Sequence, residues 1–165
     1  MRSRRVVSIL FVFKRLPNIL TIACRTHFGA WAIVSSPLIL SHDVNNDTIT
    51  DKIWYLISNR EVLAVNQAYV GDSGGVFYAS DETLQFPNIE GWQAFPGDGS
   101  KASKPVPVFA PSYQFLSKRL GDGKVAVLLM NSADTTKQLN LNLSHVPGIS
   151  CTSGCRIRDI WRHET

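Results

Sequence analysis

The sequence has little charge and no very long hydrophobic run. Charged residues make up 18% of the 165 residues and hydrophobic residues 44%, a balance that excludes a largely disordered chain. The longest apolar runs are too short to cross a bilayer as a helix, so we expect no stable membrane span. The length suits one ordinary domain and is too small for a large barrel.

Excess positive charge is confined to one end of the chain. The formal net charge is +4, but five of the 17 basic residues lie within residues 1–20, which leaves 12 basic and 13 acidic residues after them. The remainder is almost neutral. The charge therefore gives no argument for a nucleic-acid partner, and we expect none.

Cysteine is scarce. Cys24 lies in a helical pattern and is expected to pack as a small apolar residue. Cys151 and Cys155 flank a Thr-Ser-Gly turn, and they are candidates for a disulfide if the protein is secreted. Zinc is disfavoured because no further cysteine or paired histidines complete a ligand set. We expect no metal and no cofactor.

The first 20 residues combine basic residues with the apolar run VVSILFVF, as in the first two regions of a signal peptide. A small-residue cleavage site is missing before the folded part, so a disordered leader and a non-native sequence remain alternatives. Two glycosylation sequons begin at Asn46 and Asn142. They matter only if the chain enters the secretory pathway.

Residues 21–68 show a helix–strand–helix pattern. A helix is predicted over 22–34, and Pro37 stops it. Leu38–Leu40 follows as a wholly apolar strand, which is typical of a parallel sheet buried on both faces. The next helix is predicted to be capped by Asn46 or Asp47 and to end at Asn59 in a left-handed conformation, and residues 61–67 are read as a short connection. Its apolar stripe comprises Ile49, Ile53, Leu56 and Ile57.

Residues 69–165 show a β pattern. Gly71–Gly75 is predicted to be a flexible break, residues 76–80 a strand and residues 95–111 a long loop. Two further strands are predicted on either side of a Gly-Asp-Gly turn at 121–123, as a hairpin. Residues 138–144 alternate and are predicted as a strand with one apolar face. The last predicted strand has Ile157 and Trp161 on one face and Arg156 and Arg158 on the other. Together these patterns predict an antiparallel β-sandwich with one wet face. The apolar face of 138–144 comprises Leu139, Leu141 and Leu143.

Asp43, next to His42, is a candidate because it directly follows a predicted parallel strand, where α/β enzymes carry their chemistry. A lone aspartate there more often ties down its loop, and we favour that interpretation. Ser73 lies in GDSGG, which resembles the nucleophile loop of trypsin-like proteases, but the upstream histidines lie in a helix–strand unit and cannot activate it. The loop at 42–47 lacks the glycine and distal glutamate of an EF-hand.

Tryptophans could stack on sugars. Trp31, Trp54 and Trp161 fit core positions better, whereas Trp92 is expected to be exposed.

Several stretches in order resemble the α-galactosidase (melibiase) family of glycoside hydrolases. They are RTHFGAWAIVSSPLILSHDV (25–44), VLAVNQAYVG (62–71), LSKRLGDGKVAVLLMNSADTTKQLNLNLSHVPG (116–148) and RIRDIWRH (156–163). The resemblance covers about residues 25–163. It implies an α/β plus all-β fold, in which the last βα portion of a (β/α)₈ TIM barrel (21–68) is followed by a C-terminal antiparallel β-sandwich domain (69–165).

For function, the resemblance implies retaining hydrolysis of terminal α-D-galactosides by two aspartates, with a galactoside or glycan as partner and a secreted or vacuolar/lysosomal location. The family's nucleophile and acid/base belong to motifs that precede residue 25 and do not occur in residues 1–24, so no catalytic residue is carried over. Asp43 matches an aspartate at the barrel rim with no assigned role. The chain is therefore expected to be a fragment, truncated at both ends, and inactive alone.

Two alternatives remain open. One is a non-catalytic carbohydrate-binding or interaction β-sandwich, in which Trp92 would bind glycan. The other, within the same family, is an α-N-acetylgalactosaminidase.

Overall fold

The structure is a computed structural model that describes residues 5–12, 19–40, 42–86, 108–151 and 154–165. Along the chain, one N-terminal strand is followed by helices and then mainly by strands. In chain order they are β1 (Arg5–Val12), α1 (Ile19–Ile33), α2 (Asp47–Ile57), α3 (Arg60–Gln67), β2 (Gly75–Ala79), β3 (Thr83–Phe86), β4 (Val108–Pro111), β5 (Tyr113–Gly121), β6 (Lys124–Asn131), the 3₁₀ helix η1 (Leu143–His145) and β7 (Cys155–Asp159).

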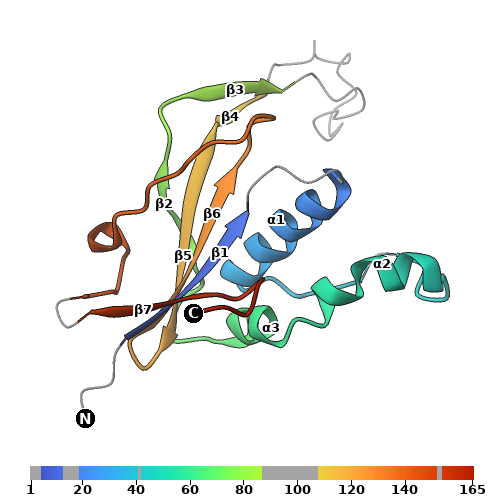
Figure 1. Cartoon of the computed structure of the whole chain (residues 1–165), viewed down its shortest axis with the longest axis horizontal. Helices are drawn as coiled ribbons and strands as arrows, with labels where there is room; N and C mark the ends of the chain where they lie inside the picture. The colour runs from blue at the N-terminus through green and yellow to red at the C-terminus, as the bar shows by residue number, and fades with distance from the viewer. Residues whose placement is uncertain (1–4, 13–18, 41, 87–107, 152–153) are drawn as a thin grey trace, which may run out of the picture.

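A five-stranded sheet with the order β2-β5-β6-β1-β7 forms the centre of the molecule (Figure 1). The strands β2, β5 and β6 are antiparallel to their neighbours in this group, whereas β1 pairs in parallel with both β6 and β7. A separate antiparallel pair is made of β3 and β4. The antiparallel part fits the predicted β-sandwich, while the parallel strand β1 was not predicted.

Strand β1 lies in the stretch that the sequence analysis interpreted as a leader. Its backbone pairs over Val7–Val12 with β6 and over Arg5–Ile9 with β7. A short run of mainly apolar residues suits a strand flanked on both sides as well as it suits a signal peptide. Composition alone therefore could not separate the two.

The predicted hairpin around residues 121–123 is confirmed as β5 and β6. Its turn has positive φ at Asp122 (51°) and Gly123 (69°), the conformation that a tight two-residue turn needs. Along β6, alternate side chains enter two different cores, so that the strand is buried on both faces. The hairpin therefore lies between the helices on one face and the apolar cluster formed with residues 139–146 on the other.

Helices α1 and α3 pack on one face of this hairpin. Their fully buried residues Ile33 and Val62 contact Leu116 and Leu128 of the sheet in one apolar cluster, which Trp161 borders. The helix predicted over 22–34 is thus confirmed as α1, and its packed face is apolar as expected. Figure 1 shows α1 beside the sheet and α2 extending away from it.

Lys118 joins the sheet to the ends of both packed helices. Its side chain projects from β5 into the helical layer and is 2% exposed. The ammonium donates to the carbonyl oxygens of Ala32 (3.3 Å), Val65 (2.5 Å) and Asn66 (2.9 Å). These carbonyls lie in the last turns of α1 and α3, where no intrahelical donor is available. Lys118 therefore caps two helices at once.

Gly74 marks the closest approach between α1 and the sheet. Its N–H donates to the carbonyl of Ile33 at 2.9 Å. A β-carbon at this position would lie 2.5 Å from the Ser117 carbonyl oxygen and 2.6 Å from that of Ile33. The glycine break predicted at 71–75 therefore includes a packing position that excludes any side chain.

The segment after β6 covers the other face of the hairpin. Leu139, Leu141 and Leu143 pack against the cluster formed by Phe115, Val125, Val127, Leu129 and Val146. The one-sided apolar pattern of residues 138–144 is confirmed, but the predicted strand is wrong, because 136–142 make no ladder and η1 follows. The alternation was set by packing on the sheet and did not require strand pairing.

The barrel portion expected for residues 21–68 is not seen as such. Leu38–Leu40 is not a strand, and Ile39 is 77% exposed. A strand needs at least one neighbouring strand to pair with, and the described residues offer none to Leu38–Leu40. Residues 61–67, predicted as a short connection, belong to helix α3 (Arg60–Gln67).

Two predicted details of the helices are also wrong. Asn59 has φ of −67° and is not left-handed, because it caps the start of α3 by accepting from the N–H groups of Glu61 and Val62. Trp54, predicted to be in the core, is 59% exposed on the outer face of α2. The cap predicted for α2 is correct, since Asn46 accepts from the Ile49 N–H at 3.2 Å.

The last predicted strand is present as β7, but its faces differ from the prediction. Ile157 is exposed, whereas Arg158 is half-buried against α3. The structure forms the disulfide between Cys151 and Cys155 just before and at the start of this strand. In the described part of the chain, no helix has the length and apolar character needed to span a membrane.

Candidate functional site

A pocket of about 740 Å³ opens on the sheet face that lies opposite the helices. One wall comes from β2 and β5, and the other from residues 137–145. This volume falls in the range of small-molecule sites, roughly 300–1,000 Å³. The lining residues are Phe77, Tyr78, Tyr113, Phe115, Lys137, Gln138, Leu139, Asn140, Leu141, Asn142 and His145.

A β-bulge in β2 shapes the first wall. Val76 pairs with Leu116 and Tyr78 pairs with Phe115, so Phe77 is an extra residue between two neighbouring pairs. Successive strand residues normally point to opposite faces, and a bulge re-aims them. As a result, Phe77 and Tyr78 both line the pocket.

Four aromatic rings gather on this wall. The rings of Tyr78 and Tyr113 stack at 5.8 Å between centroids with 29° between their planes, and Tyr78 lies 5.1 Å from Phe115. Tyr78 is 44% exposed, so one ring of the group is open to ligand. The hydrogen bond between the two phenolic oxygens, 3.4 Å apart, raises the pKa of Tyr78 above its usual 10.0. The phenol therefore stays neutral at physiological pH.

The second wall carries amides and one paired cation. Lys137 forms an ion pair with Glu82, donates to the Ser112 hydroxyl at 3.2 Å and lies 5.7 Å from the Tyr113 ring centroid. The side chains of Gln138 and Asn140 are exposed and make no hydrogen bond within the described part of the chain. They are therefore available to an incoming ligand.

The pocket has binding groups but no hydrolytic pair. None of the described residues that line it is aspartate or glutamate. Glycoside hydrolysis with retention needs two carboxyl groups about 5–5.5 Å apart. The pocket can therefore hold a polar ligand but cannot perform that reaction with its own side chains.

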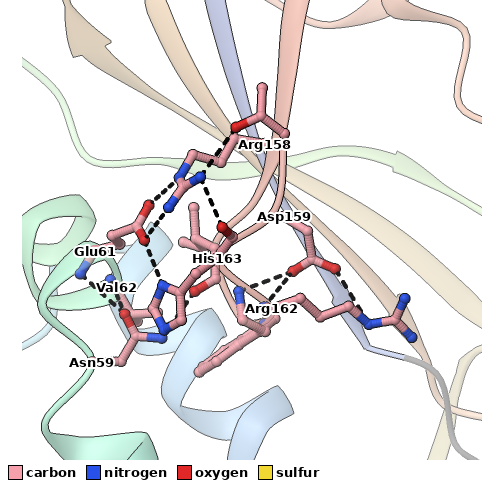
Figure 2. Close-up of polar contacts among 10 residues, drawn as sticks. Asn59, Glu61, Val62, Arg158, Asp159, Arg162 and His163 are labelled. Carbon is pink, nitrogen blue, oxygen red and sulfur yellow. Dashed lines mark hydrogen bonds and ion pairs between the residues drawn. The ribbon is translucent and has the colours of Figure 1, made fainter.

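A second polar cluster joins α3 to the C-terminal end (Figure 2). The Arg158 guanidinium donates to both carboxylate oxygens of Glu61, at 2.7 and 2.9 Å, and His163 Nδ1 lies 2.6 Å from the same carboxylate. Hydrogen bonds from Arg158 and, to a smaller extent, from His163 lower the pKa of Glu61 to about 2, against the opposing effect of burial. A carboxylate held ionised in this way is a poor general acid, and its contacts with Arg158 and His163 join α3 to the C-terminal end.

Removing this carboxylate should destabilise the protein in a pH-dependent way. Glu61→Gln is expected to lower the free energy of unfolding by about 1–2 kcal/mol at pH 7, since a bidentate, half-buried ion pair is lost. Because the folded-state pKa lies below the ordinary 4.5, the stabilisation is complete above pH 4.5 and fades as pH falls toward 2. Urea denaturation followed by circular dichroism at several pH values measures it.

The matched control is Asp72→Asn, which removes the carboxylate of an ion pair with Arg119 in which both side chains are more than half exposed. We expect it to change stability by less than about 0.5 kcal/mol. If wild type and Glu61→Gln lose stability in parallel between pH 5 and pH 2.5, the role assigned to Glu61 is wrong.

The residues singled out in the sequence do not meet in this pocket. Asp43 is exposed and accepts from the Asn45 N–H at 3.0 Å, while His42 Nε2 lies 3.2 Å from the Thr50 hydroxyl. Both contacts tie down the loop before α2, which agrees with the favoured interpretation of Asp43. Ser73 is exposed in the linker before β2, and Trp92 lies outside the described residues.

The sequons occur at helix caps. Asn46 caps α2, and Asn142 accepts from the N–H and hydroxyl of Ser144 at the start of η1.

Within the described residues, no group of three His, Cys, Asp or Glu side chains is placed to hold a metal ion.

The pocket residues were missed by sequence reasoning. The alternation in residues 138–144 contained a usable signal, because the leucines pack against the sheet and leave Gln138, Asn140 and Asn142 exposed. No such signal marked Tyr78 and Tyr113, since the bulge that brings Phe77 beside Tyr78 is not visible in the sequence.

Comparison with known proteins agrees with the resemblance seen in the sequence. Residues 110–165 match the family model described as the alpha galactosidase C-terminal beta sandwich domain. These residues span part of β4, the hairpin, the pocket segment and β7. The chain is related to the α-galactosidase family.

Curated α-galactosidases match most of the chain. The α-galactosidase of Cyamopsis tetragonoloba is 28% identical over 141 residues, which cover 86% of this chain and 26% of the relative. α-Galactosidase 1 of Saccharomyces cerevisiae is 27% identical over 143 residues, covering 83% of this chain and 26% of the relative. The chain thus spans about a quarter of the length of these α-galactosidases.

A shorter stretch is more similar to a fungal relative. α-Galactosidase mel1 of Schizosaccharomyces pombe is 46% identical over 43 residues, covering 26% of this chain and 9% of the relative. No solved structure matches the chain.

Proposed function

We propose that this chain serves as a non-catalytic, C-terminal part of an α-galactosidase. Support comes from the match of residues 110–165 to the family's β-sandwich domain. In this proposal the full-length protein hydrolyses terminal α-D-galactosides with retention, using two aspartates outside this chain. An α-N-acetylgalactosaminidase within the same family stays an alternative, because the described residues include no sugar-contacting loop of a barrel.

The main support for a non-catalytic role is the composition of the pocket. None of the described residues that line it has a carboxylate side chain. Glu61 has a pKa near 2 and both of its oxygens bound by Arg158. Asp43 lies alone in an exposed loop. Glu61 and Asp43 therefore do not form the pair of carboxyl groups, one acid and one nucleophile, that retaining hydrolysis requires.

The purified 165-residue protein is expected not to release nitrophenol from p-nitrophenyl α-galactoside above the rate of buffer. The α-galactosidase of Cyamopsis tetragonoloba serves as the positive control in the same assay. Cleavage that is lost in Asp43→Ala would make Asp43 catalytic and refute the proposal. Cleavage that survives Asp43→Ala would refute it as well, because another residue of this chain would then act.

A secreted or vacuolar location belongs to the same proposal. The disulfide between Cys151 and Cys155 supports it, because such bonds persist in oxidising compartments.

A further inference from the structure

We propose that the pocket between β2, β5 and residues 137–145 binds a neutral pyranose sugar. The inference rests on the side chains of the pocket itself and holds whether or not the chain serves an α-galactosidase. It assigns the ligand contact to residues other than Trp92.

The aromatic wall suits one side of a sugar ring. A pyranose presents a face of C–H groups surrounded by a rim of hydroxyls, so it is apolar in the middle and polar at its edge. Tyr78 offers a partly exposed ring at the pocket surface, held in place by its stack with Tyr113 and its contact with Phe115. A ring fixed in this way can stack on the C–H face with little loss of conformational freedom.

The amide wall suits the rim of hydroxyls. Each amide of Gln138 and Asn140 provides both donors and an acceptor, which matches hydroxyl groups that also act as both. These two side chains have no hydrogen-bond partner within the described chain, so binding need not break an existing bond. A few placed polar groups beside apolar rings are the usual composition of a small-molecule site.

The charges of the pocket favour an uncharged ligand. The Lys137 ammonium forms an ion pair with the Glu82 carboxylate and also donates to Ser112, so its charge is compensated by the protein. Hydrogen bonds from Lys137 and from the Ser112 hydroxyl, the latter at 2.9 Å, lower the pKa of Glu82, which keeps its carboxylate ionised at neutral pH. An acidic sugar would have to compete with Glu82 for Lys137.

Titration of the full 165-residue protein tests the proposal. Amide shifts in ¹H–¹⁵N NMR are followed with galactose, methyl α-galactoside, methyl β-galactoside, glucose and mannose. We expect saturable binding of at least one of these sugars with Kd on the order of 1 mM, the affinity of a small ligand with few contacts. The shifts should lie in β2, β5 and 137–145.

Tyr78→Ala is expected to weaken this binding by roughly threefold to tenfold, whereas Tyr78→Phe, which keeps the ring, should retain most of it. Trp54→Ala is the matched control, because Trp54 is an aromatic residue of similar exposure on α2, outside the pocket. Circular dichroism checks that each variant is folded.

Three results would overturn the proposal: no saturable shift with any of the five sugars, equal affinity in wild type and Tyr78→Ala, or a loss in Trp54→Ala as large as in Tyr78→Ala. The hydrolysis assay is independent of these outcomes. Cleavage of the aryl galactoside would refute the proposed function without affecting binding at Tyr78, and absence of sugar binding would leave the proposed function standing.

Discussion

Lys118→Met is expected to lower the free energy of unfolding by about 2–4 kcal/mol. Methionine preserves the length of the side chain but removes the ammonium that donates to Ala32, Val65 and Asn66. Each buried carbonyl left without a donor costs about 1–3 kcal/mol, and relief from burying a charge offsets part of the sum. Urea denaturation of the purified chain at pH 7 measures the change.

Lys124→Met is the control for this prediction, since Lys124 lies on the same hairpin but is exposed. It should shift stability by less than about 0.5 kcal/mol. If both variants unfold at the same urea concentration, Lys118 does not hold the two helix ends.

The pH dependence of wild type gives a second readout on Lys118. Burial lowers the pKa of this ammonium below its usual 10.5. Between the lowered pKa and 10.5 the unfolded chain binds more protons than the folded one, so stability from this group rises with pH in that window. The rise should be missing in Lys118→Met, and its persistence would contradict the assignment.

Gly74→Ala is expected to destabilise the protein by roughly 2–3 kcal/mol. The new β-carbon would meet the carbonyl oxygens of Ser117 and Ile33 at 2.5 and 2.6 Å, as well as the Ile33 side chain at 2.7 Å. Two of these three neighbours are backbone atoms, which cannot turn aside as a flexible side chain can. Helix α1 would have to move away from β5. Thermal and urea denaturation measure the loss.

Gly75→Ala is the matched control. A β-carbon at Gly75 has nothing within 4 Å, and Gly75 does not have a positive φ. The same chemical change one residue away should therefore alter stability by less than about 0.5 kcal/mol. Equal losses at Gly74 and Gly75 would show that the close approach of α1 to β5 is not present in solution.

The parts of the fold that follow from neighbouring residues could be predicted from the sequence. The hairpin needs only a Gly-Asp-Gly turn between two apolar runs, and it was predicted with its turn in the right place. Helix α2 was predicted with its cap because the Asn46 side chain binds an N–H group three residues later.

The errors concern features that depend on distant residues. Leu38–Leu40 has the composition of a buried strand, but a strand exists only where other strands pair with it. Trp54 lies on a helix whose outer face has no neighbour among the described residues, so its apolar character did not bring burial. Arg158 faces inward because Glu61, 97 positions away, offers a carboxylate.

The candidate site also depends in part on residues that are distant in the sequence. Its amides could be inferred from the alternation with leucines, while its aromatic wall depends on the register between β2 and β5. Tryptophan content pointed to Trp92 as the sugar contact, and tyrosines of moderate exposure were passed over. The side chains that can stack on a sugar are therefore set by the register between β2 and β5, which the sequence does not reveal.

The position of the hairpin in the chain has a consequence for biosynthesis. Helices α1 and α3 leave the ribosome before β5 and β6, and the hairpin on which their apolar sides pack is complete only when residue 131 or so has been made. The hairpin itself closes over a two-residue turn and can form quickly once synthesised. The nascent helices therefore pass through a stage with exposed Ile33 and Val62, in which chaperones or self-association compete with folding.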